Sequence, residues 1–182
     1  MILARRTLIA GLATFSPIVP ALAAASKPDP QADRAAAAAL RQLIASNPAA
    51  KELNEKAVAV LVFPKIVKVG FLLGGAYGEG VLRQGDQTVG YYNSAAASYG
   101  LQAGAQWFGY ALFFMKPDAL KYLEDSNGFE IGVGPSVVVV DQGLAKKISS
   151  TTLTQDVYAM IFGQKGFMAG VGLEGSKITK IN

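Results

Sequence analysis

The fold is decided between Ala59 and Leu82, where the sequence reads AVLVFPKIVKVGFLLGGAYGEGVL. An apolar block at residues 58–63, where this stretch begins, is rich in β-branched residues and is followed by Pro64. This is the pattern of a buried strand. Further on, Gly70 and Gly74 enclose a short apolar segment. Glycine inside a strand permits a sharp bend or the close approach of another segment, because no side chain stands in the way. The stretch therefore predicts β-structure that curves strongly.

The unit Gly-apolar-x-apolar-Gly recurs three more times along the chain. In a strand, successive side chains alternate between faces, so the two glycines of a unit share one face and the two apolar residues share the other. The apolar face is the natural core face, and the glycine face allows bending. Four such strands, each continuing into more β-like sequence, predict a strongly curved or partly closed antiparallel sheet. The bounding glycines are Gly70, Gly74, Gly100, Gly104, Gly128, Gly132, Gly166 and Gly170.

Helical patterns precede and interrupt the β-like sequence. Asp29-Pro30 offers a helix start, and the alanine-rich segment from Ala32 to Ser46 carries leucines at helical spacing. Asn47-Pro48 then caps a second helix through roughly Lys56. Residues 116–123 have proline near a helix start and leucines three apart. The expected fold class is α+β, with N-terminal helices, Gly-rich strands and one or two short inserted helices.

The first 25 residues have the organisation of a secretory signal peptide. Arg5 and Arg6 precede an apolar stretch from Thr7 to Val19, and small residues at 21–25 provide the cleavage pattern. As a helix this stretch spans only about 20 Å, short of the roughly 30 Å hydrocarbon core that a membrane anchor must cross. The paired arginines fit a twin-arginine signal, and an ordinary Sec signal fits as well. We expect a periplasmic or secreted protein with a linker at 26–31 and one domain at 32–182.

Composition excludes several classes of chemistry. The chain has 182 residues and contains neither histidine nor cysteine. Disulfides, Cys/His zinc sites, thiol nucleophiles and histidine-based triads are therefore excluded. Loss of Arg5 and Arg6 with the signal lowers the formal net charge from +4 to +2, so a generally basic nucleic-acid-binding protein is not expected. We expect no metal and no cofactor.

A modest group of basic residues surrounds the first β-like segment. A lysine near an anionic bilayer surface contributes about 1 kcal/mol to binding. The group is therefore a candidate site for anionic phospholipid, with acyl contacts from the N-terminal helix or from an aromatic-lined cavity, while ordinary solvated charge is the alternative. Its members are Lys51, Lys56, Lys65, Lys68 and Arg83.

Three carboxylates are the residues that an enzyme would use: Glu79, Glu130 and Glu174. Two carboxylates can perform acid–base chemistry, but the sequence brings no two of them together. The simpler interpretation is that Glu79 and Glu174 each accept backbone N–H hydrogen bonds at a strand bend or pair with a nearby lysine. We therefore expect no enzyme. A carboxylate-based hydrolase stays an alternative, as does a small outer-membrane β-barrel, which the glycine, the aromatic residues and the β periodicity fit loosely.

The stretch from Ala59 to Leu82 closely resembles the signature block of the SYLF domain family. Blocks at 99–106, 129–133 and 166–175 agree with the family in the same order, so the resemblance covers about residues 40–182. It implies a non-enzymatic lipid-binding domain, exported in bacterial members. Eukaryotic members bind phosphoinositides through an N-terminal amphipathic helix and basic residues, and some bind actin.

This chain departs from the eukaryotic pattern, because residues 32–46 carry only Arg34 and Arg41 against Asp33. An exported protein would also meet neither phosphoinositides nor actin. The partner that we expect is therefore an anionic phospholipid or membrane surface, and the resemblance identifies no protein partner.

Overall fold

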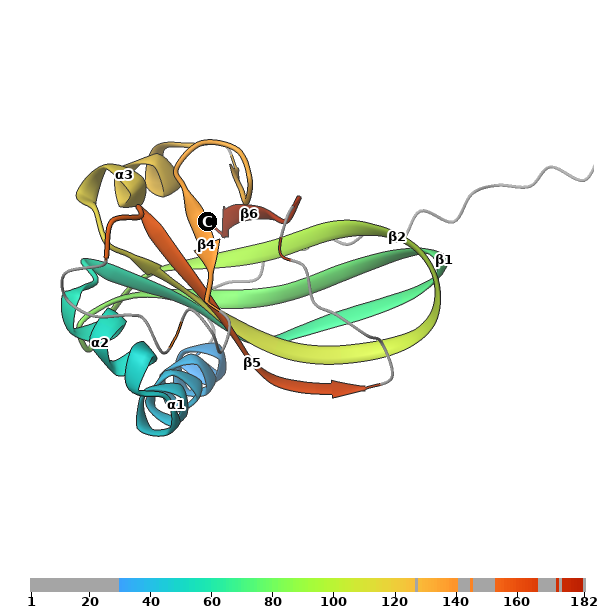
Figure 1. The fold of residues 1–182 in the computed structure, drawn as a ribbon, viewed down its shortest axis with the longest axis horizontal. Helices are drawn as coiled ribbons and strands as arrows, with labels where there is room; N and C mark the ends of the chain where they lie inside the picture. The colour runs from blue at the N-terminus through green and yellow to red at the C-terminus, as the bar shows by residue number, and fades with distance from the viewer. Residues whose placement is uncertain are drawn as a thin grey trace, which may run out of the picture.

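A computed structural model describes residues 30–126, 128–140, 145, 153–166, 173 and 175–181, without the side chains of residues 71–73, 98–103 and 166. The predicted signal peptide, Gly170 and Glu174 lie outside the described residues. The α+β fold class is confirmed, with the helices and a strongly curved sheet visible in Figure 1. The elements are α1 (Pro30–Ser46), α2 (Pro48–Lys56), β1 (Ala59–Gln84), β2 (Gln87–Phe114), α3 (Pro117–Asp125), β3 (Phe129–Glu130), β4 (Val137–Val139), β5 (Val157–Gly166) and β6 (Lys177–Ile181).

The two N-terminal helices form where the sequence predicts them. Helix α1 begins at Pro30, so it takes up the last two residues of the segment expected to be a linker. Between the helices, the side-chain oxygen of Asn47 accepts hydrogen bonds from the backbone N–H groups of Ala49 and Ala50, at 2.9 and 3.3 Å. Pro48 follows at the first helical position, where its missing N–H costs nothing.

Strands β1 and β2 form one long antiparallel hairpin whose tight turn contains Gly85, with a φ angle of 57°. A straight strand with the 26 residues of β1 would run roughly 85 Å. Instead both strands turn back on themselves, at the right-hand end of Figure 1. Gly70 lies opposite Gly104 and Gly74 lies opposite Ser98, and the register shifts between Gly70 and Leu72. The first two glycine units therefore lie together at a bend, as their sequence predicts.

The bend divides the hairpin into two arms. Residues 59–69 and 105–114 form the first arm, and residues 75–84 and 87–97 form the second. The arms contact each other, because a Cβ atom placed on Gly80 would lie 2.5 Å from the ring of Phe63. The hydroxyl of Tyr110 in the first arm also donates a 2.7 Å hydrogen bond to Ser94 in the second.

The remaining strands extend each arm separately. The first arm of β2 pairs with β5, which pairs with β4, while the second arm pairs with β6, which pairs with β3. Within the described residues, the result is a six-stranded sheet curled into a half-barrel. One pair differs from the antiparallel expectation, since β4 and β5 run parallel. Residues 140–156 between them give a connection long enough to return to the same end of the sheet, which a parallel pair requires.

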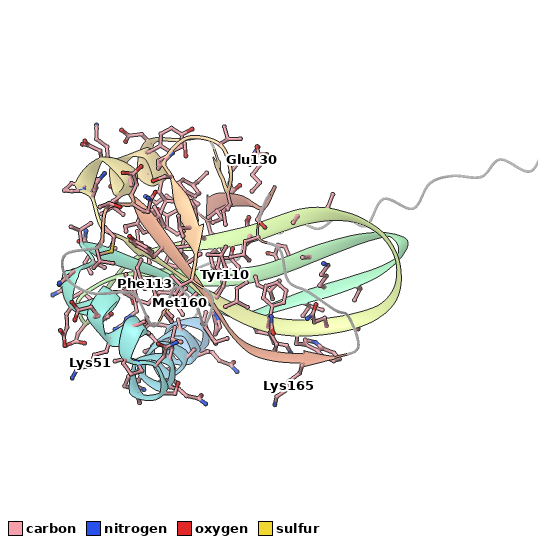
Figure 2. The ribbon with its side chains drawn as sticks, viewed as in Figure 1. Lys51, Tyr110, Phe113, Glu130, Met160 and Lys165 are labelled. Atoms are coloured by element: carbon pink, nitrogen blue, oxygen red, sulfur yellow. The ribbon has the colours of Figure 1, made fainter. Side chains whose placement is uncertain are left out.

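Each face of the curled sheet has its own core. The inner face packs against α3 and contains the stacked rings of Phe63 and Tyr110, whose centroids are 4.6 Å apart. The outer face carries Val62 and Phe113 among other apolar residues and is packed by α1 and α2. Figure 2 labels Tyr110 of the inner core and Phe113 and Met160 of the outer core, all in the middle of the molecule.

The third glycine unit, Gly128–Gly132, differs from the expected long strand. Its alternation is as predicted, because Phe129 and Ile131 are buried and Glu130 is exposed. The strand itself has only two residues, Phe129 and Glu130. Both glycines have positive φ angles, 142° and 104°, which end the extended conformation on either side. In the fourth unit, Gly166 is the last residue of β5.

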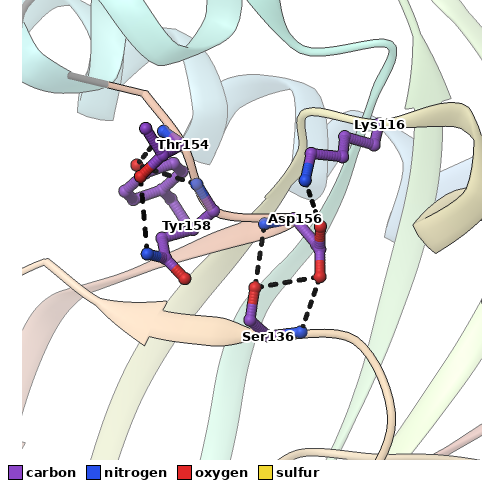
Figure 3. A network of polar contacts seen from close by, with 6 residues as sticks. Lys116, Ser136, Thr154, Asp156 and Tyr158 are labelled. Atoms are coloured by element: carbon purple, nitrogen blue, oxygen red, sulfur yellow. Dashed lines mark hydrogen bonds and ion pairs between the residues drawn. The ribbon is translucent and has the colours of Figure 1, made fainter.

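Asp156 ties three segments together in a polar network (Figure 3). Its carboxylate accepts hydrogen bonds from the ammonium group of Lys116 at 2.7 Å and from the backbone N–H and hydroxyl of Ser136, both at 2.9 Å. The hydroxyl of Tyr158 accepts from the backbone of Thr154 nearby. These bonds lower the pKa of Asp156 from 3.8 to about 2, and the bond from Lys116 has a larger effect than either bond from Ser136.

We expect Asp156→Asn to lower the free energy of unfolding by about 1 kcal/mol at neutral pH, since the carboxylate is partly solvated and screened. The pKa of Asp156 is lower in the folded state, so its stabilisation is complete above about pH 4 and is lost as the pH falls toward 2. Thermal unfolding of both proteins across this range measures the effect. A difference in melting temperature that stays constant down to pH 2 would contradict it.

Candidate functional site

The five predicted lipid-binding residues do not form one patch. Lys51 and Lys56 lie on α2, and each pairs with a glutamate one helical turn away, Lys51 with Glu55 at 4.0 Å and Lys56 with Glu52 at 2.7 Å. Figure 2 shows Lys51 at the helical end of the molecule, away from the bend of the hairpin. These two lysines form part of a solvated helix surface in which positive and negative charges alternate.

Arg83 connects helix α1 to the turn of the hairpin. Its guanidinium lies 3.2 Å from the carboxylate of Asp33 on α1 and donates a 2.8 Å hydrogen bond to the carbonyl of Asp86 in the hairpin turn. The hydroxyl of Thr88 donates to the same carboxylate. Only 11% of the Arg83 side chain is exposed. These contacts attach α1 to the end of the second arm and leave little of the guanidinium for a ligand.

Lys65 and Lys68 lie on β1 but in different settings. Lys65 is exposed at an irregularity of the strand, where the register with β2 shifts between Phe63 and Ile66. Lys68 is partly buried and lies opposite Gln106. Gln106 is buried, and its side-chain oxygen has no hydrogen-bond partner among the described residues. Residues opposite one another in an antiparallel pair share a face, so Lys68 belongs to the inner face with Gln106.

The outer face of the sheet is covered by α1 and α2 at one end, and no described helix or strand covers it near the bend. Trp107 alternates along β2 with Ala111 and Phe113, which pack in the outer core, and it lies opposite Val67. Side chains two residues apart on a strand share a face. Trp107, Val67 and Val69 therefore continue the face that the helices cover. Trp107 is 41% exposed and Val69 is 52% exposed.

An apolar groove of about 640 Å³ adjoins this part of the outer face through Val67 and Val69, and its lining also includes Ala76, which packs against the inner core. The groove lies where β1 bends, because one wall comes from β1 before the bend and the other from β1 after it. The adjoining segment of β2 completes it. The described part of the lining consists of valine, glycine and alanine together with Tyr77. The residues are Val67, Val69, Gly74, Gly75, Ala76, Tyr77, Ala95, Ala96 and Ala97.

One polar pair lies at the groove. The hydroxyl of Tyr77 donates a hydrogen bond to the carboxylate of Glu79 at 3.3 Å. Burial raises the pKa of Tyr77 above its usual value, and the charge of Glu79 and this hydrogen bond raise it further. Tyr77 is therefore neutral at physiological pH, with its hydroxyl already engaged. Glu79 accepts this bond from a side-chain hydroxyl, whereas the sequence interpretation named backbone N–H groups or a lysine as its partners.

A second lysine joins Lys65 beside the outer face near the bend. Lys165 on β5 lies opposite Trp107, which lies opposite Val67, so the three residues form one row across the sheet. Lys165 is exposed, and Figure 2 shows it far from Lys51, on the part of β5 nearer the bend. Within the described part of the chain, neither Lys65 nor Lys165 makes an ion pair. We refer to Lys65, Val67, Val69, Trp107 and Lys165 together with the groove as the distal face.

The described residues offer no second cluster with obvious chemistry. Glu130 is exposed on β3, away from Glu79 on β1 in sequence and in the sheet order. No three acidic side chains in the described ranges are grouped so that they could hold a metal ion. Among the helices that the structure describes, none has the length and apolarity needed to cross a membrane.

Comparison with known proteins gives a family match over the C-terminal part of the chain. No curated protein matches the chain. Residues 95–182 match the family model Ysc84, described as "Las17-binding protein actin regulator". The match begins at Ala95 in the groove and runs through Trp107, α3 and β3 to β6. It agrees with the resemblance that the glycine blocks indicate. Residues 95–182 are therefore similar to the Ysc84 (SYLF) domain family, which confirms the resemblance over this part of the chain.

Proposed function

We propose that this protein is an exported, non-enzymatic lipid-binding domain that associates with membranes containing anionic phospholipid. The family that it resembles is associated with lipid binding. The observation that carries the proposal is the distal face, where exposed apolar side chains and an apolar groove lie beside two lysines without ion pairs among the described residues. Export rests on the predicted signal peptide. An exported protein would not meet the actin-related partner in the family description, so we propose lipid instead.

The chemistry of the distal face suits a membrane interface. The indole of Trp107 combines an apolar ring with an N–H donor, and such side chains concentrate at the level of lipid headgroups. Val69 next to it is half exposed and gains from leaving water. Each lysine adds about 1 kcal/mol near an anionic surface. Apolar and electrostatic contributions therefore act at the same place and in the same direction.

Sedimentation with lipid vesicles tests this function. We expect the mature protein from residue 26 onward to sediment with phosphatidylglycerol or cardiolipin vesicles at low salt and far less with phosphatidylcholine vesicles. Added salt is expected to weaken the binding, because exposed charges are screened within about 10 Å at 0.1 M. Absence of binding to both anionic lipids at low salt would overturn the proposal.

A further inference from the structure

We propose that the groove of the distal face takes up one acyl chain of an anionic phospholipid, so that the protein holds a single lipid molecule in addition to lying on the bilayer. This proposal rests on the function proposed above and names its ligand and its binding site. The step is noncovalent: one hydrocarbon chain leaves the bilayer and enters the groove.

The lining of the groove selects hydrocarbon. Among the described residues that line it, all except Tyr77 are valine, alanine or glycine, and the Tyr77 hydroxyl is engaged by Glu79. A polar ligand would lose its hydrogen bonds to water there without gaining replacements from side chains. The volume of about 640 Å³ lies within the range of sites that bury small organic ligands, roughly 300 to 1,000 Å³.

The lysines favour a phospholipid over a free fatty acid. Lys165 is separated from Val67 at the groove by two strand spacings, roughly 10 Å. Lys65 lies on β1, two residues before Val67. One fatty-acid carboxylate is too small to reach both cations. The phosphate of a bound phospholipid and those of its neighbours in the bilayer match two cations that are spread apart.

Gly75 provides a way to close the groove without disturbing the fold. A Cβ atom at Gly75 would meet only the carbonyl oxygen of Ala96, at an ordinary contact distance of 3.6 Å. Ala97 lies opposite Gly75 in the register and also lines the groove. Larger side chains at either position occupy space that the acyl chain needs. Val89 is 41% exposed on the same hairpin but does not line the groove, so it is a matched control position.

The test measures retained lipid and vesicle binding separately. Mature protein is incubated with phosphatidylglycerol vesicles, separated from them by flotation, and examined by native mass spectrometry. We expect the wild type and Val89→Phe to carry one phosphatidylglycerol. We expect Gly75→Phe and the smaller change Ala97→Leu to carry roughly tenfold less, because excluding even two methylenes from an apolar site weakens binding by about that factor. All four proteins should still sediment with the vesicles.

Each outcome has a distinct meaning. Wild-type protein that sediments but leaves the vesicles without lipid would overturn this proposal and leave membrane association intact. Full lipid retention by both groove-filling variants would overturn the groove as the site. A protein that elutes from its expression host with a fatty acid in place of a phospholipid would overturn the choice of ligand. Failure of the wild type to sediment would overturn the proposed function itself.

Discussion

Gly78→Ala is expected to lower the free energy of unfolding by about 3 kcal/mol, a large loss for the addition of one methyl group. The new Cβ atom would collide with the carbonyl oxygen of Lys65 and with the side chain of Ile66. A backbone carbonyl cannot rotate away as a side chain can, so the two halves of β1 must separate. Urea denaturation followed by circular dichroism measures the change.

Gly75→Ala is the matched control for this prediction. It adds the same methyl group to the same strand, three residues earlier, where the nearest atom is 3.6 Å away. Its stability should equal that of the wild type or exceed it by a few tenths of a kcal/mol, because a glycine in a strand interior is entropically costly. Equal stabilities of the two variants would show that the halves of β1 do not pack as described.

Reversing both distal lysines, Lys65→Glu with Lys165→Glu, is expected to weaken binding to phosphatidylglycerol vesicles by roughly a thousandfold. Each reversal removes an attraction of about 1 kcal/mol and adds a similar repulsion, so the pair amounts to about 4 kcal/mol. Both side chains are exposed, and no ion pair within the described residues is broken. Co-sedimentation over a series of lipid concentrations gives the affinity.

The control variant carries the same charge change on α2. Lys51→Glu with Lys56→Glu reverses two lysines that already pair with Glu55 and Glu52. Charges away from the contact surface are screened over about 10 Å at 0.1 M salt, so we expect a much smaller loss of affinity. Equal losses for both double variants would mean that the protein responds to net charge alone and that the distal face is not the docking surface.

Much of this fold can be predicted from the sequence, because the residues that start helices and form strands act on their immediate neighbours. The Asn47-Pro48 cap, the apolar strand at 59–63 and the proline that begins α3 each act within a few residues. The bend is predictable for the same reason, since Gly70 and Gly74 lie in one short segment. Positive φ angles at Gly128 and Gly132 shorten β3, and the composition of that unit does not reveal them.

The distal face could not be assembled from the sequence, because its residues come from distant parts of the chain. Trp107 lies among several aromatic residues of β2 that are buried, and only the register with Val67 and Lys165 reveals its exposure. Arg83 resembles the neighbouring lysines in sequence. Its contact with Asp33 across 50 residues makes it a structural residue. The spacing of residues along the chain predicts neither the row of Val67, Trp107 and Lys165 nor the contact between Arg83 and Asp33.

The bend of the hairpin also determines how this end of the molecule responds to dehydration. It is formed inside two paired strands and not by a loop, and pairing resumes after one register shift, which separates the pair Gly70–Gly104 from the pair Leu72–Gly100. A loop would present unpaired amide and carbonyl groups, each of which costs several kcal/mol in a medium without water. Paired strands satisfy many of these groups within the protein. The end of the half-barrel next to the groove can therefore enter an apolar phase at a lower cost than a loop of the same length.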